Sequence, residues 1–333
     1  MRPDVALDVR ETSHTSAGML QYVRALRTHL PRVAPELRIA TIGGGDNFDL
    51  AEQLGLPLAI ARLRPRLVHF PTLYVPRIVP APYVVTIHDL IDLEYPDYGK
   101  RKVGPYWRYL VGPVLRGARA VITDDDATVA LLRRYVGVAP ERVRVVPLGV
   151  DAPAPLPAPV VRARPYLFYA GNHRPHKDLG TLVRAWETLP ERYAVDLVMT
   201  GPPEPALASA RRGQGELVFL GERDAAELWG FHRGAAAYVH AALREGFGLP
   251  LLEALRVGTP VIAAEPAVPG VLRAHVERFA AGDVAALRAL AERALDRDPA
   301  LRERAERGRE ATAGLTWERT ARATADVYRE LLA

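Results

Sequence analysis

Short apolar runs alternate with amphipathic stretches along the chain from its beginning to its end. An apolar run of about four to eight residues is typical of a buried strand, whereas apolar positions three or four residues apart are typical of a helix. Strands that alternate with helices indicate an α/β fold with parallel sheets. In chain order, the predicted strands are Val5–Val9, Leu37–Ile42, Leu67–Phe70, Tyr83–Ile87, Ala120–Thr123, Val143–Val146, Tyr166–Ala170, Val195–Thr200, Leu217–Leu220, Ala236–His240 and Pro260–Ala263.

Helical patterns lie between several of these strands. Gly18–Leu30 and Ala127–Tyr135 are predicted helices in the first half, and the pattern is helical from Leu287 onward. The last segment, Trp317–Leu332, has an apolar stripe made of Ala321, Ala325, Val327, Tyr328 and Leu331. This spacing predicts an amphipathic helix that packs with one face on a domain.

A proline-rich segment divides the alternation into two halves. Residues 152–159 alternate proline with small residues, which neither a helix nor a central strand tolerates, so 152–165 is predicted to be an extended linker. The predicted domains are therefore 1–151 and 166–314, each a doubly wound, Rossmann-like α/β domain. Two such domains leave a cleft, and ligands of such sheets bind at the carboxyl ends of the strands.

The composition is that of an ordinary globular protein, with 49% hydrophobic and 25% charged residues. No apolar run reaches the roughly 18 to 20 residues that span a bilayer, and the N-terminus has no signal-peptide pattern. The chain has no cysteine, which excludes disulfides and thiolate chemistry and favours a cytoplasmic location. The net charge of +5 favours anionic ligands or surfaces.

The segment from Glu245 to Glu253 carries most of the functional information. A glycine-rich loop (246–248) is followed by Pro250, which suits the first turn of a helix, and Gly258 ends that helix. One glutamate therefore lies before the helix and the other lies one turn inside it, where both can face a ligand bound at the helix N-terminus. From the spacing alone, the alternative is two solvated carboxylates on a surface helix.

A second candidate site follows the strand that begins the second half. Gly171 permits a tight turn there, and Arg174 and Lys177 supply cations just before a helix that starts near Asp178. Lysine is rare in this arginine-rich chain, so its presence at position 177 favours a need for a compact ammonium group. A phosphate or diphosphate suits this chemistry. A solvated basic loop is the alternative.

Two polar clusters follow strands of the first half. His88 and Asp89 end one strand and face the predicted cleft, although a histidine at a strand end is often a packing or capping residue. The run Asp124–Asp126 precedes a helix. Because aspartate is a common helix cap and no further ligands accompany the run, capping is the preferred interpretation and a metal site is the alternative.

These segments together resemble the retaining GT-B glycosyltransferases of family four. The resemblance runs nearly end to end and rests on the following segments: Gly18–Tyr22, His88–Leu90, Arg142–Asp151, Gly171–Leu179, Glu245–Leu255, Gly258–Ile262 and Trp317 at the start of the terminal helix. It implies the GT-B architecture, with two Rossmann-like domains facing across a cleft. It also implies that residues 315–333 form a helix that crosses back onto the first domain.

The resemblance implies transfer of a sugar from a nucleoside diphosphate sugar to an acceptor, with retention at the anomeric carbon. Lys177 and Arg174 would bind the diphosphate. Glu245 would contact sugar hydroxyls, and Glu253 would contact the ribose. His88 would contact the transferred sugar near the reacting centre. The remaining donor-binding positions that it implies are Gly18, Gly171, Gly246, Phe247 and Gly248. Neither a metal nor a cofactor beyond the nucleotide-sugar co-substrate is expected.

The sequence departs from the family pattern at three places. Asn172 stands where an arginine is common, which leaves the phosphate role of Arg174 less secure than that of Lys177. Leu20 replaces the second glycine of the first helix, and Ala241–Ala242 replaces a Pro-Ser pair. Because the two glutamates and Lys177 are retained, we expect an active enzyme with an altered cleft.

Two other functional classes stay open at this point. A phosphorylase or a sugar-nucleotide epimerase would use the same anion site, and its products would distinguish it. Alternatively, the basic and aromatic stretch Tyr98–Tyr109 would bind a membrane surface or nucleic acid without catalysis. We expect a cytoplasmic protein with a saccharide, lipid-linked or small-molecule acceptor. Nucleic acid is not an expected partner, and peripheral contact with the inner face of the membrane stays open.

Overall fold

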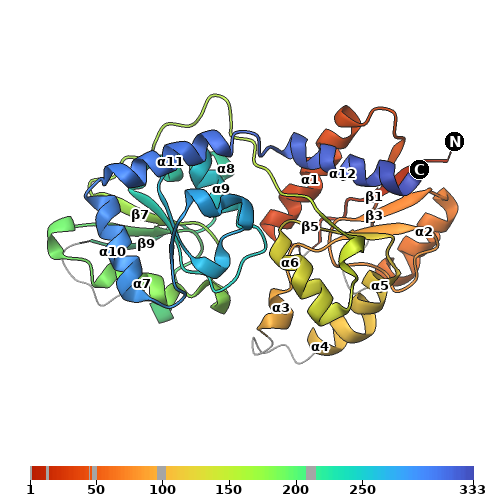
Figure 1. The fold of residues 1–333 in the computed structure, drawn as a ribbon, viewed down its shortest axis with the longest axis horizontal. Coiled ribbons are helices and arrows are strands. Elements are labelled where there is room, and N and C mark those ends of the chain that lie inside the picture. The colour runs from red at the N-terminus through yellow and green to blue at the C-terminus, as the bar shows by residue number, and fades with distance from the viewer. Residues whose placement is uncertain (1, 13–14, 45, 47–50, 96–102, 208–214) are drawn as a thin grey trace. The chain divides into compact units, whose positions relative to one another are not determined.

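The structure, a computed structural model, describes residues 2–12, 15–44, 46, 51–95, 103–207 and 215–333. It forms two compact units (Figure 1). Unit 1 comprises Met1–Gly149 and Leu315–Ala333, and unit 2 comprises Val150–Gly314. Both units are α/β units built on a six-stranded parallel sheet, so the predicted fold class is confirmed.

The sheet of unit 1 has the strand order β2-β1-β3-β4-β5-β6. Its strands are β1 (Val5–Asp8), β2 (Ile39–Ile42), β3 (Leu67–Phe70), β4 (Tyr83–Thr86), β5 (Ala120–Thr123) and β6 (Val143–Val145). Every residue of β1, β3 and β5 is buried, as expected for parallel strands that helices cover on both faces. Each predicted strand of the first half is confirmed to within two residues at either end.

Helices connect these strands. They are α1 (Ala17–Val33), η1 (Ala51–Gly55), α2 (Leu56–Leu63), α3 (Ile91–Glu94), α4 (Val103–Tyr106), η2 (Trp107–Val111), α5 (Gly112–Gly117), α6 (Asp126–Leu131), η3 (Leu132–Val136) and η4 (Pro140–Arg142). The side chain of Ser16 caps α1 by accepting from the Met19 amide, and Asp125 caps α6 by accepting from the Ala127 amide. The cap predicted for the aspartate run is therefore confirmed at Asp125.

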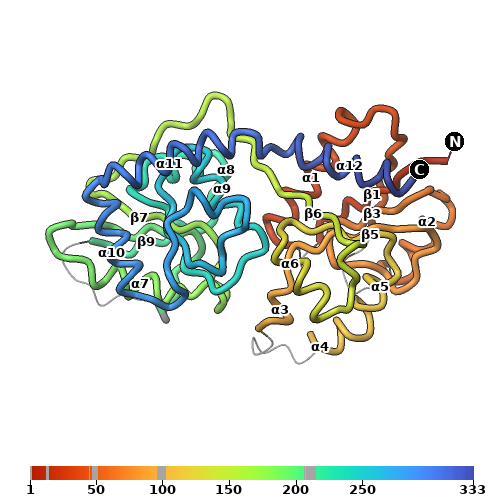
Figure 2. The backbone as a smooth tube through the Cα atoms, in the orientation of Figure 1, coloured from red at the N-terminus to blue at the C-terminus, as the bar shows by residue number. Residues whose placement is uncertain are grey.

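The C-terminal helix α12 (Trp317–Leu332) belongs to unit 1, where it packs along α1 (Figure 2). Tyr328 anchors it, because the phenol oxygen lies 2.6 Å from Nδ1 of the buried His69 in β3. The backbone of Thr316 passes so close to Gly149 that a Cβ on Gly149 would lie 2.1 Å from the Thr316 carbonyl carbon. The two chain segments at the edge of unit 1 therefore touch, and only glycine fits at position 149.

The sheet of unit 2 has the strand order β12-β11-β10-β7-β8-β9. Its strands are β7 (Tyr166–Tyr169), β8 (Asp196–Met199), β9 (Leu217–Phe219), β10 (Ala237–His240), β11 (Val261–Ala264) and β12 (Glu277–Phe279). The five predicted strands are confirmed to within two residues at either end. The edge strand β12 was not predicted, because Glu277 and Arg278 interrupt its apolar pattern.

The helices of unit 2 cover both faces of this sheet. They are η5 (Pro175–Lys177), α7 (Leu179–Glu187), η6 (Glu191–Tyr193), η7 (Pro205–Leu207), α8 (Ala225–Gly234), α9 (Leu249–Arg256), η8 (Glu265–Ala267), η9 (Gly270–His275), α10 (Val284–Leu295) and α11 (Pro299–Ala311). The proline-rich segment 152–165 has neither helix nor strand. It is part of unit 2, where its Val160 amide donates to the Gly230 carbonyl.

Candidate functional site

The strand order of unit 2 reverses between β7 and β10, which are adjacent and parallel. In a doubly wound sheet, ligands bind outside the carboxyl ends of the strands at such a switch point. The predicted residues Gly171, Arg174 and Lys177 follow β7 directly, and the segment from Glu245 to Glu253 follows β10. The fold thus brings both predicted halves of the donor site to one place.

Lys177 and Glu245 form an ion pair at this switch point, although they are 68 residues apart in the chain. The Lys177 ammonium donates to Oε1 of Glu245, and the two side chains are only 9% and 11% exposed. The same oxygen lies 2.5 Å from Nε2 of His240, the last residue of β10. Tyr238 extends the cluster, because its hydroxyl donates to the Ala170 carbonyl and lies 3.1 Å from Nδ1 of His240.

The charges of this cluster keep Glu245 ionised. Burial alone would raise the pKa of the Glu245 carboxyl, but the positive charge of Lys177 and the hydrogen bonds from His240 and Lys177 lower it to about 2. Since the carboxylate can only accept, Nε2 of His240 must carry the hydrogen that points at it.

The cluster leaves ligand-binding capacity on both partners. Lys177 and His240 both donate to Oε1 of Glu245, while Oε2 accepts no hydrogen bond from any residue that the structure describes. An ammonium group carries three hydrogens, and Glu245 uses one of them. Oε2 can therefore accept from a ligand hydroxyl while the remaining ammonium hydrogens donate to an anion.

The loop after β7 is shaped for close approach of a ligand. A Cβ on Gly171 would lie 2.6 Å from the Tyr169 hydroxyl, so only glycine fits, and the Gly171 amide donates to Thr200 Oγ1 at 2.9 Å. Asn172 braces the loop by accepting from the Arg174 amide. The Arg174 side chain is exposed and makes no ion pair with the described part of the chain. Its guanidinium group is thus available for an anion.

The loop before α9 has the predicted form. Gly248 caps the helix with a left-handed φ of 74°, Pro250 is its second residue, and Phe247 is buried beneath the loop next to the partly exposed Gly246. Glu253 lies one turn inside the helix, with Oε2 3.5 Å from Nε2 of His232. Neither oxygen of Glu253 accepts a hydrogen bond within the described ranges, so the carboxylate retains acceptor capacity for ligand hydroxyls.

The two other predicted residues lie in unit 1. His88 follows β4 and is nine-tenths buried, with Nδ1 2.7 Å from Asp124 Oδ2 and Nε2 3.2 Å from the Pro71 carbonyl. Gly18 is the second residue of α1, one turn before Tyr22, whose ring meets the His88 ring edge-on at 4.8 Å. Within the aspartate run, the Asp124 side chain turns to His88 and leaves the cap predicted for the run to Asp125.

Sequence reasoning missed a charged cluster at the switch point of unit 1, between β1 and β3. Asp8, the last residue of β1, accepts from Arg10 at 2.8 Å, and the same guanidinium group donates to the Tyr74 carbonyl at 2.7 Å. Glu52 lies 3.5 Å from the other terminal nitrogen of Arg10. Asp8, Arg10 and Glu52 are all buried. The sequence signal that could have revealed this cluster is the pair of opposite charges, Asp8 and Arg10, at the end of an apolar strand.

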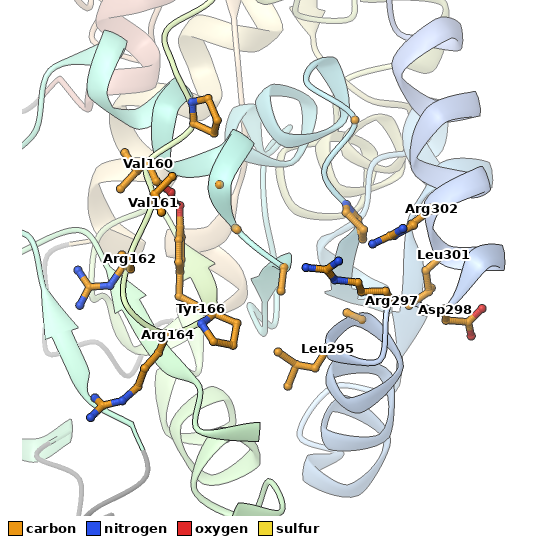
Figure 3. A pocket seen from close by; sticks show the side chains of 18 of the residues that line it. Val160, Val161, Arg162, Arg164, Tyr166, Leu295, Arg297, Asp298, Leu301 and Arg302 are labelled. Atoms are coloured by element: carbon orange, nitrogen blue, oxygen red, sulfur yellow. Dashed lines mark hydrogen bonds between the residues drawn. The ribbon is translucent and has the colours of Figure 1, made fainter. Parts of the chain in front are cut away.

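A cavity of about 950 Å³ lies at the opposite end of the unit 2 sheet (Figure 3). Tyr166 at the start of β7 and Pro260 before β11 line it, together with Arg297 and Arg302 near the α10–α11 junction. None of the predicted site residues lines this cavity. It lies at the amino ends of the strands, away from the Lys177–Glu245 cluster.

Comparison with known proteins identifies the family. Residues 22–154 match the family described as Glycosyltransferase Family 4, and residues 159–311 match the family described as Glycosyl transferases group 1. The chain belongs to the family four, group 1 glycosyltransferases. The predicted resemblance is therefore confirmed. The departures at Asn172, Leu20 and Ala241–Ala242 are features of this family member, in which both alanines are fully buried.

Among its relatives, O-antigen chain mannosyltransferase B of Escherichia coli is 25% identical over an alignment of 215 positions, which covers 59% of this chain and 56% of that protein. D-inositol 3-phosphate glycosyltransferase of Acidothermus cellulolyticus is 29% identical over an alignment of 291 positions, which covers 76% of this chain and 62% of that protein. Each alignment thus spans less than two thirds of the relative. The solved structure of HepE from Anabaena, in complex with UDP and glucose, has a TM-score of 0.74 at 15% identity and covers 99% of this chain and 100% of that one. This likeness shows that the family member has the GT-B fold.

No helix in the described parts of the chain is both long and apolar enough to cross a membrane.

Proposed function

We propose that this protein transfers a sugar from a nucleoside diphosphate sugar to an acceptor hydroxyl, with retention at the anomeric carbon. The observation that carries the proposal is the Lys177–Glu245 pair at the switch point of unit 2, with the exposed Arg174 nearby in sequence. Cations suit the diphosphate, and the free Oε2 of Glu245 suits the sugar hydroxyls. Glu253 is the proposed acceptor of hydrogen bonds from the ribose.

The names of relatives support the same class of reaction. A mannosyltransferase and an inositol phosphate glycosyltransferase both move sugars, and HepE was solved with UDP and glucose. Because these relatives differ in sugar and acceptor, the proposal names neither for this chain. We propose that unit 2 binds the donor and unit 1 the acceptor, with His88 in contact with the transferred sugar and the α1 start at Gly18 near the phosphates.

In the proposed reaction, the bond between the anomeric carbon and the diphosphate oxygen breaks while the acceptor oxygen bonds to the same face of that carbon. The acceptor proton passes to the departing phosphate oxygen, so that no covalent intermediate with the protein forms. The protein then acts by positioning the reactants and by stabilising the negative charge that develops on the diphosphate. Lys177 and Arg174 are the proposed stabilising groups, and neither a metal nor a further cofactor takes part.

Peripheral membrane contact is proposed as part of this function, for a lipid-linked acceptor. Ile78 and Tyr109 are 70% and 63% exposed, and they are neighbours because Arg77, next to Ile78, donates to the Tyr109 carbonyl. Arg108 adds a second exposed cation. Apolar side chains among cations suit an anionic lipid surface. Residues 98–102 of the predicted basic stretch lie outside the described residues. Equal sedimentation with vesicles of neutral and of anionic lipid would contradict this contact.

The proposed function is tested by incubating the protein with UDP-, GDP- and ADP-sugars and a panel of sugar, polyol and lipid-linked acceptors. The expected result is a nucleoside diphosphate and a glycosylated acceptor in equal amounts, with the anomeric configuration of the donor retained in the NMR spectrum of the product. An inverted product would refute retention. A changed sugar without any acceptor would indicate an epimerase, and a sugar phosphate formed from free phosphate would indicate a phosphorylase.

A further inference from the structure

His88 and Asp124 form a buried pair at the carboxyl ends of the neighbouring strands β4 and β5. The residues are 36 positions apart, and Nδ1 of His88 lies 2.7 Å from Oδ2 of Asp124. The Asp124 side chain is only 1% exposed. Because its neighbour Asp125 caps α6, Asp124 is not needed as a cap, and its side chain contacts His88 instead.

The hydrogen-bond partners of His88 and Asp124 determine which of their atoms carry protons. Nε2 of His88 lies 3.2 Å from the Pro71 carbonyl oxygen, which can only accept, so Nε2 carries a hydrogen. A second proton must lie between Nδ1 and Oδ2, since a carboxylate facing a bare nitrogen would be repelled. Oδ1 of Asp124 is buried and accepts no hydrogen bond from any described residue. The carboxylate therefore depends on His88, and removing the shared proton would leave a costly buried charge.

The other groups around His88 support retention of this proton. Burial alone would lower the pKa of His88, but the charge of Asp124 and its hydrogen bond raise it, and Asp89 acts in the same direction. The neighbouring His69 stays neutral, because burial and the charge of His88 lower its pKa to about 3. Tyr22 meets the imidazole edge-on, and its own pKa is raised by burial, so its phenol is neutral as well.

We propose that Asp124 is a positioning residue for His88, which fixes the orientation of the imidazole and retains the shared proton, so that the ring stays positively charged and its Nε2–H, shared with the Pro71 carbonyl, is a charge-assisted donor for a sugar oxygen. This inference rests on the proposed function, in which His88 contacts the transferred sugar. Asp124 itself touches neither substrate nor reacting atoms. Its effect is on the protonation and direction of the group that does.

The test compares Asp124→Asn with the matched control Asp125→Asn. Both substitutions remove one carboxylate charge, but asparagine at position 125 can still cap α6. The titration of His88 is followed by NMR of its Cε1–H signal, assigned by its absence in His88→Gln. In Asp124→Asn the midpoint should fall by about one to three pH units, the usual effect of removing an opposite charge nearby. In Asp125→Asn it should stay at the wild-type value. An unchanged midpoint in Asp124→Asn would overturn the pairing.

The pH dependence of sugar transfer tests the positioning role. In the wild type, activity should persist to a higher pH than in Asp124→Asn, whose alkaline loss should move down by the same about one to three pH units. Asp125→Asn should follow the wild type. Identical profiles in all three proteins would overturn the positioning role while sugar transfer itself stands. Absence of sugar transfer by all three proteins would refute the proposed function and, with it, the positioning role. The NMR titration would still test whether His88 and Asp124 are paired. If Asp124→Asn does not fold, Asp124→Ser replaces it in both measurements.

Discussion

The Lys177–Glu245 pair should contribute measurably to stability, and Lys177→Met is the change that tests it. Methionine keeps most of the length and packing of the lysine side chain but removes its charge. Breaking one partner of a buried ion pair is costly, because the remaining charge stays buried without its counter-charge. In the variant, Glu245 would retain only His240 as a hydrogen-bond donor within the described cluster.

The size of the effect follows from the ionisation of Glu245. Its pKa is lowered from 4.5 to about 2 in the folded protein. A difference of about 2.5 pH units corresponds to about 3 kcal/mol at about 1.4 kcal/mol each. Because the folded pKa is the lower one, this stabilisation is fully present above about pH 4.5 and is lost as the pH falls toward about 2. Most of it should disappear in Lys177→Met, since Lys177 supplies the largest favourable charge.

Calorimetric unfolding at a series of pH values between 7 and 3 would measure this. At neutral pH, Lys177→Met should lose about 2 to 3 kcal/mol relative to the wild type, and the difference should shrink as the pH falls below about 4.5. Arg174→Met is the matched control for stability. Its exposed cation makes no ion pair in the described chain, so its change should stay within about 0.5 kcal/mol. A loss below about 0.5 kcal/mol in Lys177→Met, or one independent of pH, would show that the Lys177–Glu245 pair does not stabilise the folded protein.

Three further substitutions test other contacts. Glu253→Ala should weaken donor binding about tenfold, with turnover at saturating donor unchanged, because a ribose contact is present in ground and transition states alike; equal affinity in a calorimetric titration would contradict that role. Gly149→Ala should lower stability by about 1 to 3 kcal/mol, because its Cβ meets the Thr316 backbone; an unchanged melting temperature would show that the two segments separate freely. Tyr328→Phe should cost about 1 to 2 kcal/mol, because it leaves Nδ1 of His69 without its hydroxyl partner; in denaturant unfolding, stability equal to the wild type would argue against that anchor.

The strands could be predicted because the strands of a covered parallel sheet are buried, so they appear in the sequence as short runs of apolar residues. All residues of β7 and of β10 are buried and apolar or aromatic except His240, and both strands were found from their pattern. The edge strand β12 was not predicted, because its middle residue is exposed and polar and so interrupts the apolar pattern. The loop-helix motif from Glu245 to Glu253 could also be predicted, because glycine and proline encode its backbone locally.

The side-chain pairs could not be predicted, because they join residues that only the folded chain brings together. Lys177 and Glu245 were both recognised as ligand-binding candidates, but their mutual ion pair depends on the pairing of β7 with β10. The same holds for His88 and Asp124, which meet because β4 pairs with β5. The sequence shows that the aspartate run caps a helix, but not that Asp125 is the cap and that Asp124 pairs with His88. Local sequence patterns determine where helices and strands form, whereas the pairing of strands determines which distant side chains meet.

Titration of UDP, GDP and ADP into the wild type and Lys177→Met in a calorimeter tests the proposed donor site most directly. We expect one nucleoside diphosphate to bind the wild type and to bind the variant at least about tenfold more weakly, the loss expected for one charge-assisted hydrogen bond. Equal affinity in the two proteins, or no binding of any nucleoside diphosphate to the wild type, would contradict a donor site at the Lys177–Glu245 pair.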